Sequence, residues 1–218
     1  MFNRLIDNIP MGATILHMGD CGVGRNPGRS MKKLASHAKN RDQTIMIIRG
    51  NHDNPKWYPH KFSDNVRLLG DYTELEFPNG TNGICVGGGI SLDRSISMLG
   101  YDYWDNETTP FRPHLCTPST FLFLHDAPSY FNNQSYTLKV GHFSSYIDQD
   151  ESLMADCIAQ RDVIDKITEL CTPKYIYGGH FHNSVSDRID GVTYRCLNIN
   201  ELYLLHADIG LDDSDRNT

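Results

Sequence analysis

Four apolar runs of this chain end in the same way, in glycine, histidine and acidic or amide residues. The runs close on HMGD, RGNHD, FLHD and YGGHFH, at residues 17–20, 49–53, 123–126 and 177–182. Short apolar runs bounded by turn residues are typical of buried strands. In open α/β sheets, ligands bind beyond the carboxyl ends of the strands. The pattern therefore predicts one rim on which these polar side chains gather.

The segments around these runs predict a mixed α/β fold. Residues 13–19 and 44–50 have the pattern of buried strands, with a helix at 31–38 between them, which is the order of a βαβ unit. Residues 66–89 predict an antiparallel meander of three short strands. The remaining expected elements are helices at 2–8 and 152–171, strands at 120–126, 192–199 and 202–206, and a strand running into a glycine turn at 174–182.

Length and composition limit the class of protein. The 218 residues, 39% hydrophobic and 22% charged, fit a single domain, expected at 1–210 with a flexible tail at 211–218. No apolar run approaches the roughly 20 residues of a bilayer span, and residues 1–10 lack the apolar centre of a secretory signal, so a cytoplasmic location is expected. The net charge of −7 disfavours general nucleic-acid binding. Six cysteines without paired spacing argue against a disulfide framework.

The candidate site consists of side chains that follow the predicted strands. Taken singly, each has an ordinary explanation, because glycine, asparagine and aspartate are common turn residues and a single histidine after a strand is commonly structural. Together they offer oxygen and imidazole ligands, which suit Mn, Fe, Zn or Ni and need no thiolate. The set favours a metal site, and its members are Asp20, Asn51, His52, His125, His180 and His182.

The order of these motifs resembles the calcineurin-like metallophosphoesterase family. The motifs are Gly19-Asp20, then GNHD at 50–53, then His125, then GHFH at 179–182. The segments VGGGISLDR, FLHDAP and CLNINE also resemble connecting segments of small bacterial and phage members. The resemblance implies a four-layer αββα sandwich, with two mixed β-sheets flanked by helices and a two-metal site at the strand ends.

The resemblance also implies the metal ligands. Asp20 would bridge two ions, and His182 would bind the first of them. Asn51, His125 and His180 would complete the second site. The ions would be divalent, one or two per chain, with Mn expected first and Fe, Zn or Ni as alternatives.

The implied reaction is hydrolysis of a phosphomonoester or phosphodiester by metal-activated water. His52 would be the general acid that protonates the leaving group, and Asp53 would orient its imidazole and raise its pKa. Arg49 and Arg94 are candidate phosphate contacts, because a guanidinium matches phosphate oxygens in fork geometry, although surface salt bridges explain them equally well. Substrate specificity is expected to depend on the loops at 92–118 and 128–150.

The chain departs from the family pattern at its start. Family members begin with a strand ending in D-x-H that holds the first metal, and no such strand precedes Gly19-Asp20. Three explanations are open: an N-terminally shortened form, a one-metal relative, or replacement by His206 and Asp208 at the end of another apolar segment. That segment is otherwise an ordinary edge strand. The alternative function is therefore a catalytically weakened or silent one-metal relative that acts as a binding or scaffold protein.

Overall fold

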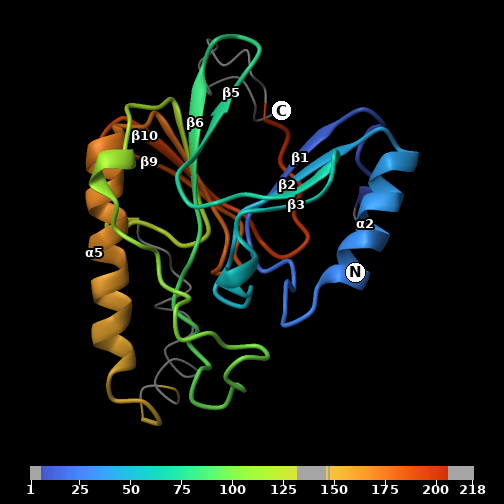
Figure 1. The fold of residues 1–218 in the computed structure, drawn as a ribbon. Coiled ribbons are helices and arrows are strands. Elements are labelled where there is room, and N and C mark those ends of the chain that lie inside the picture. Colours follow the sequence, from blue (N-terminus) through green and yellow to red (C-terminus); the bar gives the residue numbers. More distant parts are fainter. Residues whose placement is uncertain (1–5, 132–145, 147, 206–218) are drawn as a thin grey trace.

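The computed structural model describes residues 6–131, 146 and 148–205, and in them two mixed β-sheets lie face to face between two long helices (Figure 1). The four-stranded sheet has the strand order β1-β2-β4-β3, and the six-stranded sheet has the order β5-β6-β7-β8-β10-β9. In chain order the elements are β1 (Thr14–His17), α2 (Gly28–Asn40), β2 (Thr44–Ile47), η1 (Pro55–Trp57), β3 (His60–Ser63), β4 (Val66–Leu68), β5 (Thr73–Glu76), β6 (Asn82–Val86), η2 (Pro113–Leu115), β7 (Phe121–Leu124), α5 (Leu153–Cys171), β8 (Tyr175–Gly178), β9 (Val185–Ile189) and β10 (Val192–Cys196).

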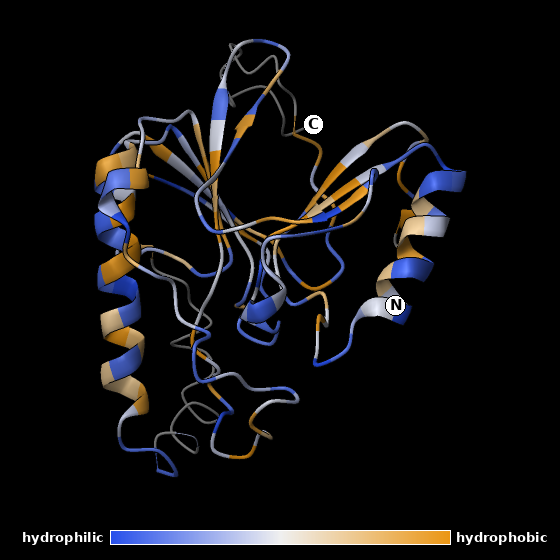
Figure 2. Cartoon of the chain, viewed as in Figure 1, coloured by the Kyte–Doolittle hydropathy of each residue, from blue (hydrophilic) through white to orange (hydrophobic). Residues whose placement is uncertain are grey.

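Side-chain alternation along the strands produces the four layers. On β2, Ile45 and Ile47 belong to the core beneath α2, whereas Met46 packs into the core between the sheets. On β7, Leu122 belongs to the core shared with α5, and Phe121 faces the other sheet. Successive strand residues point to opposite faces, so strands apolar on both faces can fill a core on each side. Figure 2 shows these largely hydrophobic strands between two helices of mixed hydropathy.

Parallel pairing places the ends of the key strands together. β1 pairs with β2 in parallel in one sheet, and β7 pairs with β8 in parallel in the other. The carboxyl ends of such strands lie at the same edge of their sheet. The loops that follow β1, β2, β7 and β8 therefore form the rim where the sequence places its polar segments.

Several of the expected elements are confirmed. The strands expected at 13–19, 44–50, 120–126 and 174–182 contain β1, β2, β7 and β8. The helix expected at 152–171 contains α5, and the helix expected at 31–38 lies within α2, which extends beyond it at both ends. The four-layer α/β sandwich is also confirmed. Of the helix expected at 2–8, residues 2–5 lie outside the described residues, as does most of the loop at 128–150.

The antiparallel meander expected at 66–89 is wrong. β4 belongs to the four-stranded sheet, where it pairs in parallel with β2 and antiparallel with β3. β5 and β6 form an antiparallel pair, but at the edge of the six-stranded sheet. The chain crosses from one sheet to the other after β4. A three-residue strand has too little pattern to reveal which sheet it joins.

Two strands were not expected, and one expected strand is absent. β3 and β9 consist mainly of exposed or half-buried residues, so they carry no apolar run that would indicate a strand. Residues 202–205, expected as part of a strand, have no regular structure, and Leu204 is 71% exposed. β3 and β9 are edge strands, and pairing at a sheet edge depends on neighbours in space, not on local hydrophobicity.

Candidate metal centre

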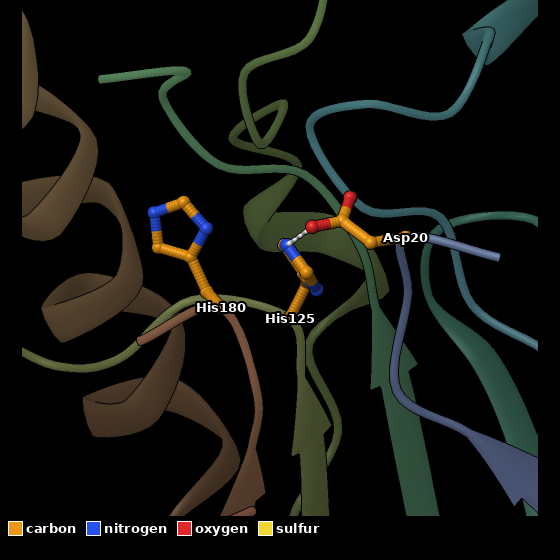
Figure 3. Close-up of side chains that lie close together, drawn as sticks. All are labelled: Asp20, His125 and His180. Carbon is orange, nitrogen blue, oxygen red and sulfur yellow. Dashed lines mark ion pairs between the residues drawn. The ribbon is translucent and has the colours of Figure 1, made fainter. Parts of the chain in front are cut away.

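Four polar side chains meet at the rim formed by the two sheets. Asp20 follows β1 and Asn51 follows β2, whereas His125 follows β7 directly and His180 follows β8. Ligand atoms of Asp20, His125 and His180 all lie within 4.8 Å of one another. Figure 3 shows the two imidazoles and the carboxylate close together, with the ion pair between His125 and Asp20 dashed. Each sheet thus contributes residues to one cluster.

The shortest contacts of the cluster involve His125. Its Nε2 lies 3.3 Å from Asp20 Oδ2 and 2.9 Å from Asn51 Oδ1. The ring centroids of His125 and His180 are 5.0 Å apart. His125 and Asn51 are almost fully buried. Two oxygens and an imidazole nitrogen therefore share one small region, beside a second imidazole.

The remaining nitrogen of His125 fixes how the ring is presented. Its Nδ1 lies 2.6 Å from the carbonyl oxygen of Met18, a group that can only accept a hydrogen bond. Nδ1 therefore carries a proton, and once Nε2 loses its own proton the ring offers the Nε2 lone pair to the cluster. A ligating histidine usually donates its other N–H in this way. The donor set, two imidazoles with a carboxylate and an amide oxygen, suits Mn, Fe, Zn or Ni.

The charges of the cluster suit a cation. The neighbouring imidazoles, His125 above all, outweigh burial and hold the pKa of Asp20 well below its usual range. Burial, reinforced by the charge of His125, lowers the pKa of His180 to about 3. Burial would also lower the pKa of His125, but the charge and hydrogen bond of Asp20 raise it to about 9. At neutral pH the cluster thus holds one exchangeable proton, on His125, at the position where a metal ion would bind.

The backbone of this rim is held in an uncommon conformation. Asp20, His180 and His182 have φ values of 56°, 62° and 51°. Few non-glycine residues adopt positive φ, although aspartate and histidine do so more readily than most. Such conformations persist where the surrounding structure enforces them, and they concentrate at functional sites.

Close approach of the loops after β1 and β2 explains the glycine at position 50. A Cβ added there would lie 2.0 Å from Asp20 Oδ1 and 2.4 Å from Asp20 N. Gly50 is not among the glycines with positive φ, so it provides space rather than a special backbone angle. This approach lets the backbone N–H of His52 donate to Asp20 Oδ1 at 3.0 Å.

Replacing Gly50 by alanine should therefore destabilise the protein by about 2 kcal/mol or more, because one of the contacting atoms is the backbone nitrogen of Asp20, which cannot rotate away from the added Cβ. Urea unfolding would measure the loss. Gly24→Ala is the matched control from the same loop region, since its added Cβ would meet nothing closer than 3.9 Å. Equal unfolding free energies for the two variants would contradict this account.

His52 lies beside the cluster and is held by residues after β6. Its Nδ1 lies 2.8 Å from the carbonyl oxygen of Asp102, and its own carbonyl accepts a hydrogen bond from Trp104 Nε1 at 3.2 Å. Burial opposes the charged ring, but the charge of Asp20 and the Asp102 hydrogen bond together raise the pKa of His52. A raised pKa favours the protonated imidazole, which is the form that a general acid requires.

Asp53 has different neighbours from those expected. Its carboxylate accepts hydrogen bonds from the backbone N–H groups of Val23 (2.8 Å), Gly50 (2.9 Å) and Cys21 (3.3 Å). The His52 ring, in contrast, is oriented by Asp102. Asp53 therefore ties together the loops after β1 and β2, and a catalytic role for it stays a prediction.

The other candidates are placed as follows. His182 follows β8, and its charge acts on His180, but it is not part of the cluster of Asp20, His125 and His180. Arg49 is buried and donates to the Glu107 and Thr108 carbonyls and to Asp71, so the structure does not place it as a phosphate contact. Arg94 is paired with two carboxylates, Asp150 and Asp156. His206 and Asp208 lie outside the described residues.

Two buried residues at the rim had not been expected. Ser91 and Glu107 are 0% and 2% exposed, and they connect to Asn51 through hydrogen bonds. The only sequence signals were a serine two residues after the glycine run at 87–89 and a glutamate three residues after the aromatic pair at 103–104. Neither pattern indicates that two loops meet.

Comparison with known families agrees with the fold and the cluster. The family model for calcineurin-like phosphoesterases matches residues 1–184, which is most of the chain. Among curated proteins, none matches the chain. Neither helix in the described part has the length and apolar character needed to cross a bilayer. The match covers every strand and loop that supplies the cluster, and the chain belongs to the calcineurin-like phosphoesterase family.

Proposed function

We propose that this chain is a metal-dependent phosphoesterase that hydrolyses a phosphomonoester or phosphodiester. The observation that supports it best is the convergence of Asp20, His125 and His180 within 4.8 Å, with Asn51 Oδ1 beside them. When bound there, a divalent ion, Mn by our proposal, supplies a Lewis acid that polarises the phosphoryl oxygen and lowers the pKa of water. Family membership supports phosphoester hydrolysis in general, and the donor set accommodates Mn as it does Fe, Zn or Ni.

The chain's own residues hold and orient the reactants. Asn51 and His125 each present one ligand atom and are fixed by hydrogen bonds through their other polar atom. His52, with its raised pKa, donates a proton from Nε2 to the leaving-group oxygen, while its Nδ1–H remains on the Asp102 carbonyl. His182, beside His180, is a proposed ligand of a further ion.

The test is release of nitrophenol from p-nitrophenyl phosphate and from bis(p-nitrophenyl) phosphate, with and without Mn²⁺. Activity with Mn²⁺ that is lost in Asn51→Ala would support the proposal. The preferred ester would show whether the enzyme is a monoesterase or a diesterase. Absence of turnover with every divalent metal tried would contradict it.

His52→Ala should separate proton donation from metal chemistry. We expect kcat to fall by about 10²- to 10⁴-fold for phenyl phosphate, whose leaving group needs a proton, and far less for p-nitrophenyl phosphate. His114→Ala is the control, because His114 is an exposed histidine of η2. Equal losses with both esters would argue that His52 is not the acid.

A second candidate function is a catalytically silent metal-binding relative. The observation that favours it is that the described residues contain one cluster of metal-ligand groups, which His182 does not join. A single ion would still polarise a phosphoryl oxygen, but it would lack the additional water activation that a second ion supplies. Calorimetry with Mn²⁺ distinguishes the two candidates, because two ions per chain support the enzyme and one ion without turnover supports the silent relative.

A further inference from the structure

The side-chain amide of Asn51 is useful to a cation in only one orientation. Its Oδ1 lies 2.9 Å from His125 Nε2, and its Nδ2 donates to Ser91 Oγ at 2.9 Å. Turning the amide by 180° would put an NH₂ group, which cannot bind a cation, against the cluster. Asn51 is 1% exposed, so water cannot serve both orientations equally.

The partner that determines this orientation is a buried carboxylate. Glu107 Oε2 accepts the hydroxyl proton of Ser91 at 2.5 Å, and its Oε1 accepts the Ser91 backbone N–H at 2.8 Å. A carboxylate cannot donate, so the single hydroxyl proton of Ser91 is committed to Glu107. Ser91 Oγ is then left with lone pairs only, and they accept from Asn51 Nδ2.

We infer that Glu107 is a positioning residue: through Ser91, it fixes the Asn51 amide so that Oδ1 faces the cation site. This inference rests on the proposed metal-dependent function. The three residues form a buried chain of donors with one direction, which begins at Asn51 and ends at Glu107. Groups that orient a ligand commonly change metal affinity about 10- to 100-fold when they are removed.

Glu107→Gln tests the direction of these hydrogen bonds, because glutamine has the same shape as glutamate but can donate a hydrogen bond. The backbone carbonyl of Glu107, which accepts from Arg49 Nη1 and from Gly89 N, is unchanged by this substitution. The glutamine NH₂ can donate to Ser91 Oγ, which frees the serine proton to bond Asn51 Oδ1. That arrangement reverses the chain and turns the amide NH₂ towards the cluster.

The first measurement is the Kd for Mn²⁺, determined by calorimetry on the full chain. Burial raises the pKa of Glu107 to about 7, so the titration is run about one pH unit or more above that value, where the carboxylate is ionised. We expect E107Q to raise the Kd about 10- to 100-fold. The matched control is Asp165→Asn, because Asp165 accepts the N–H and O–H of Ser129 in the same pattern without connecting to the site.

The second measurement asks whether direction, and not packing, is responsible. Asn51→Asp replaces the amide with a carboxylate, which has no donor end to misplace. We expect E107Q to weaken Mn²⁺ binding when Asn51 is present. In the chain that already carries N51D it should not, because the freed serine proton bonds one carboxylate oxygen. A double-mutant cycle gives this dependence directly. Should E107Q not fold, Ser91→Ala replaces it in the same cycle, because it removes the relay atom.

The possible outcomes distinguish failure of the positioning role of Glu107 from failure of the proposed metal-dependent function. If the unmodified chain does not bind Mn²⁺, the proposed function and the inference are both overturned. If it binds but E107Q changes the Kd less than about twofold, the positioning role alone is overturned. An equal loss from E107Q with and without N51D also overturns it, since a merely structural role would act on both chains alike.

Discussion

Asp20→Asn should reduce turnover by about 10³-fold or more while leaving the fold intact. The substitution removes the one anionic ligand of the cluster but keeps an oxygen that can accept the His52 N–H. Asparagine also tolerates the positive φ of 56° at this position. A second effect follows from charge: without the carboxylate, burial dominates, and the pKa of His125 should fall from about 9 to below its ordinary value.

Two measurements check this expectation. Steady-state hydrolysis with Mn²⁺ gives the loss of turnover, and NMR titration of the His125 ring gives its pKa. Asp64→Asn is the control, because Asp64 is a fully exposed aspartate that pairs with Lys61 at the surface. A variant of Asp20 that keeps turnover within about tenfold of the unmodified chain would show that the carboxylate is not a ligand in the reaction.

Mn²⁺ binding should release about one proton per ion at neutral pH. That a proton is released, and not taken up, follows from the pKa values of Asp20, His125 and His180 in the metal-free cluster. Asp20 is ionised and His180 is neutral, so neither has a proton to lose, whereas His125, with a pKa of about 9, is protonated. Because the ion binds only neutral imidazole, affinity should rise about tenfold per pH unit above neutrality and level off near pH 9.

Calorimetry in buffers of different ionisation enthalpy counts the released protons. His125→Gln is the diagnostic variant: it should bind Mn²⁺ more weakly and release no proton. Release of two protons would mean that His180 is also charged before binding. No release would mean that Asp20 does not hold a proton on His125.

Much of the fold could be predicted from the spacing of apolar residues, because the central strands and both helices bury such residues at the spacing that is typical of a strand or a helix. β2 and β7 are apolar on both faces, and their position between two layers follows from that pattern. The pairing of the edge strands could not be predicted in this way. β3 and β9 are polar, and β4 is three residues long, so their places depend on neighbouring strands and on the crossing between sheets.

The site residues also fall into a group that the sequence predicts and a group that it does not. Asp20, Asn51, His125 and His180 each follow a strand end. Parallel pairing brings the first two to one edge of the four-stranded sheet and the last two to one edge of the six-stranded sheet, and the packing of the two sheets brings these edges together. The partners that hold them come from loops. Asp102 on the His52 ring, and Ser91 with Glu107 behind Asn51, reach the rim through chain segments whose path no short pattern encodes. Ligand candidates were therefore visible in the sequence, whereas the groups that orient them were not.

The cluster also connects two β-sheets that have no hydrogen-bonded strand in common. Asp20 and Asn51 extend from the four-stranded sheet, His125 and His180 extend from the six-stranded sheet, and the two sheets share no strand. An ion held by one pair from each sheet would connect the two sheets of the sandwich directly. Removal of the ion by a chelator should then weaken the packing between the sheets before it weakens either sheet. Catalysis and the rigidity of the whole sandwich would depend on the same metal–ligand bonds.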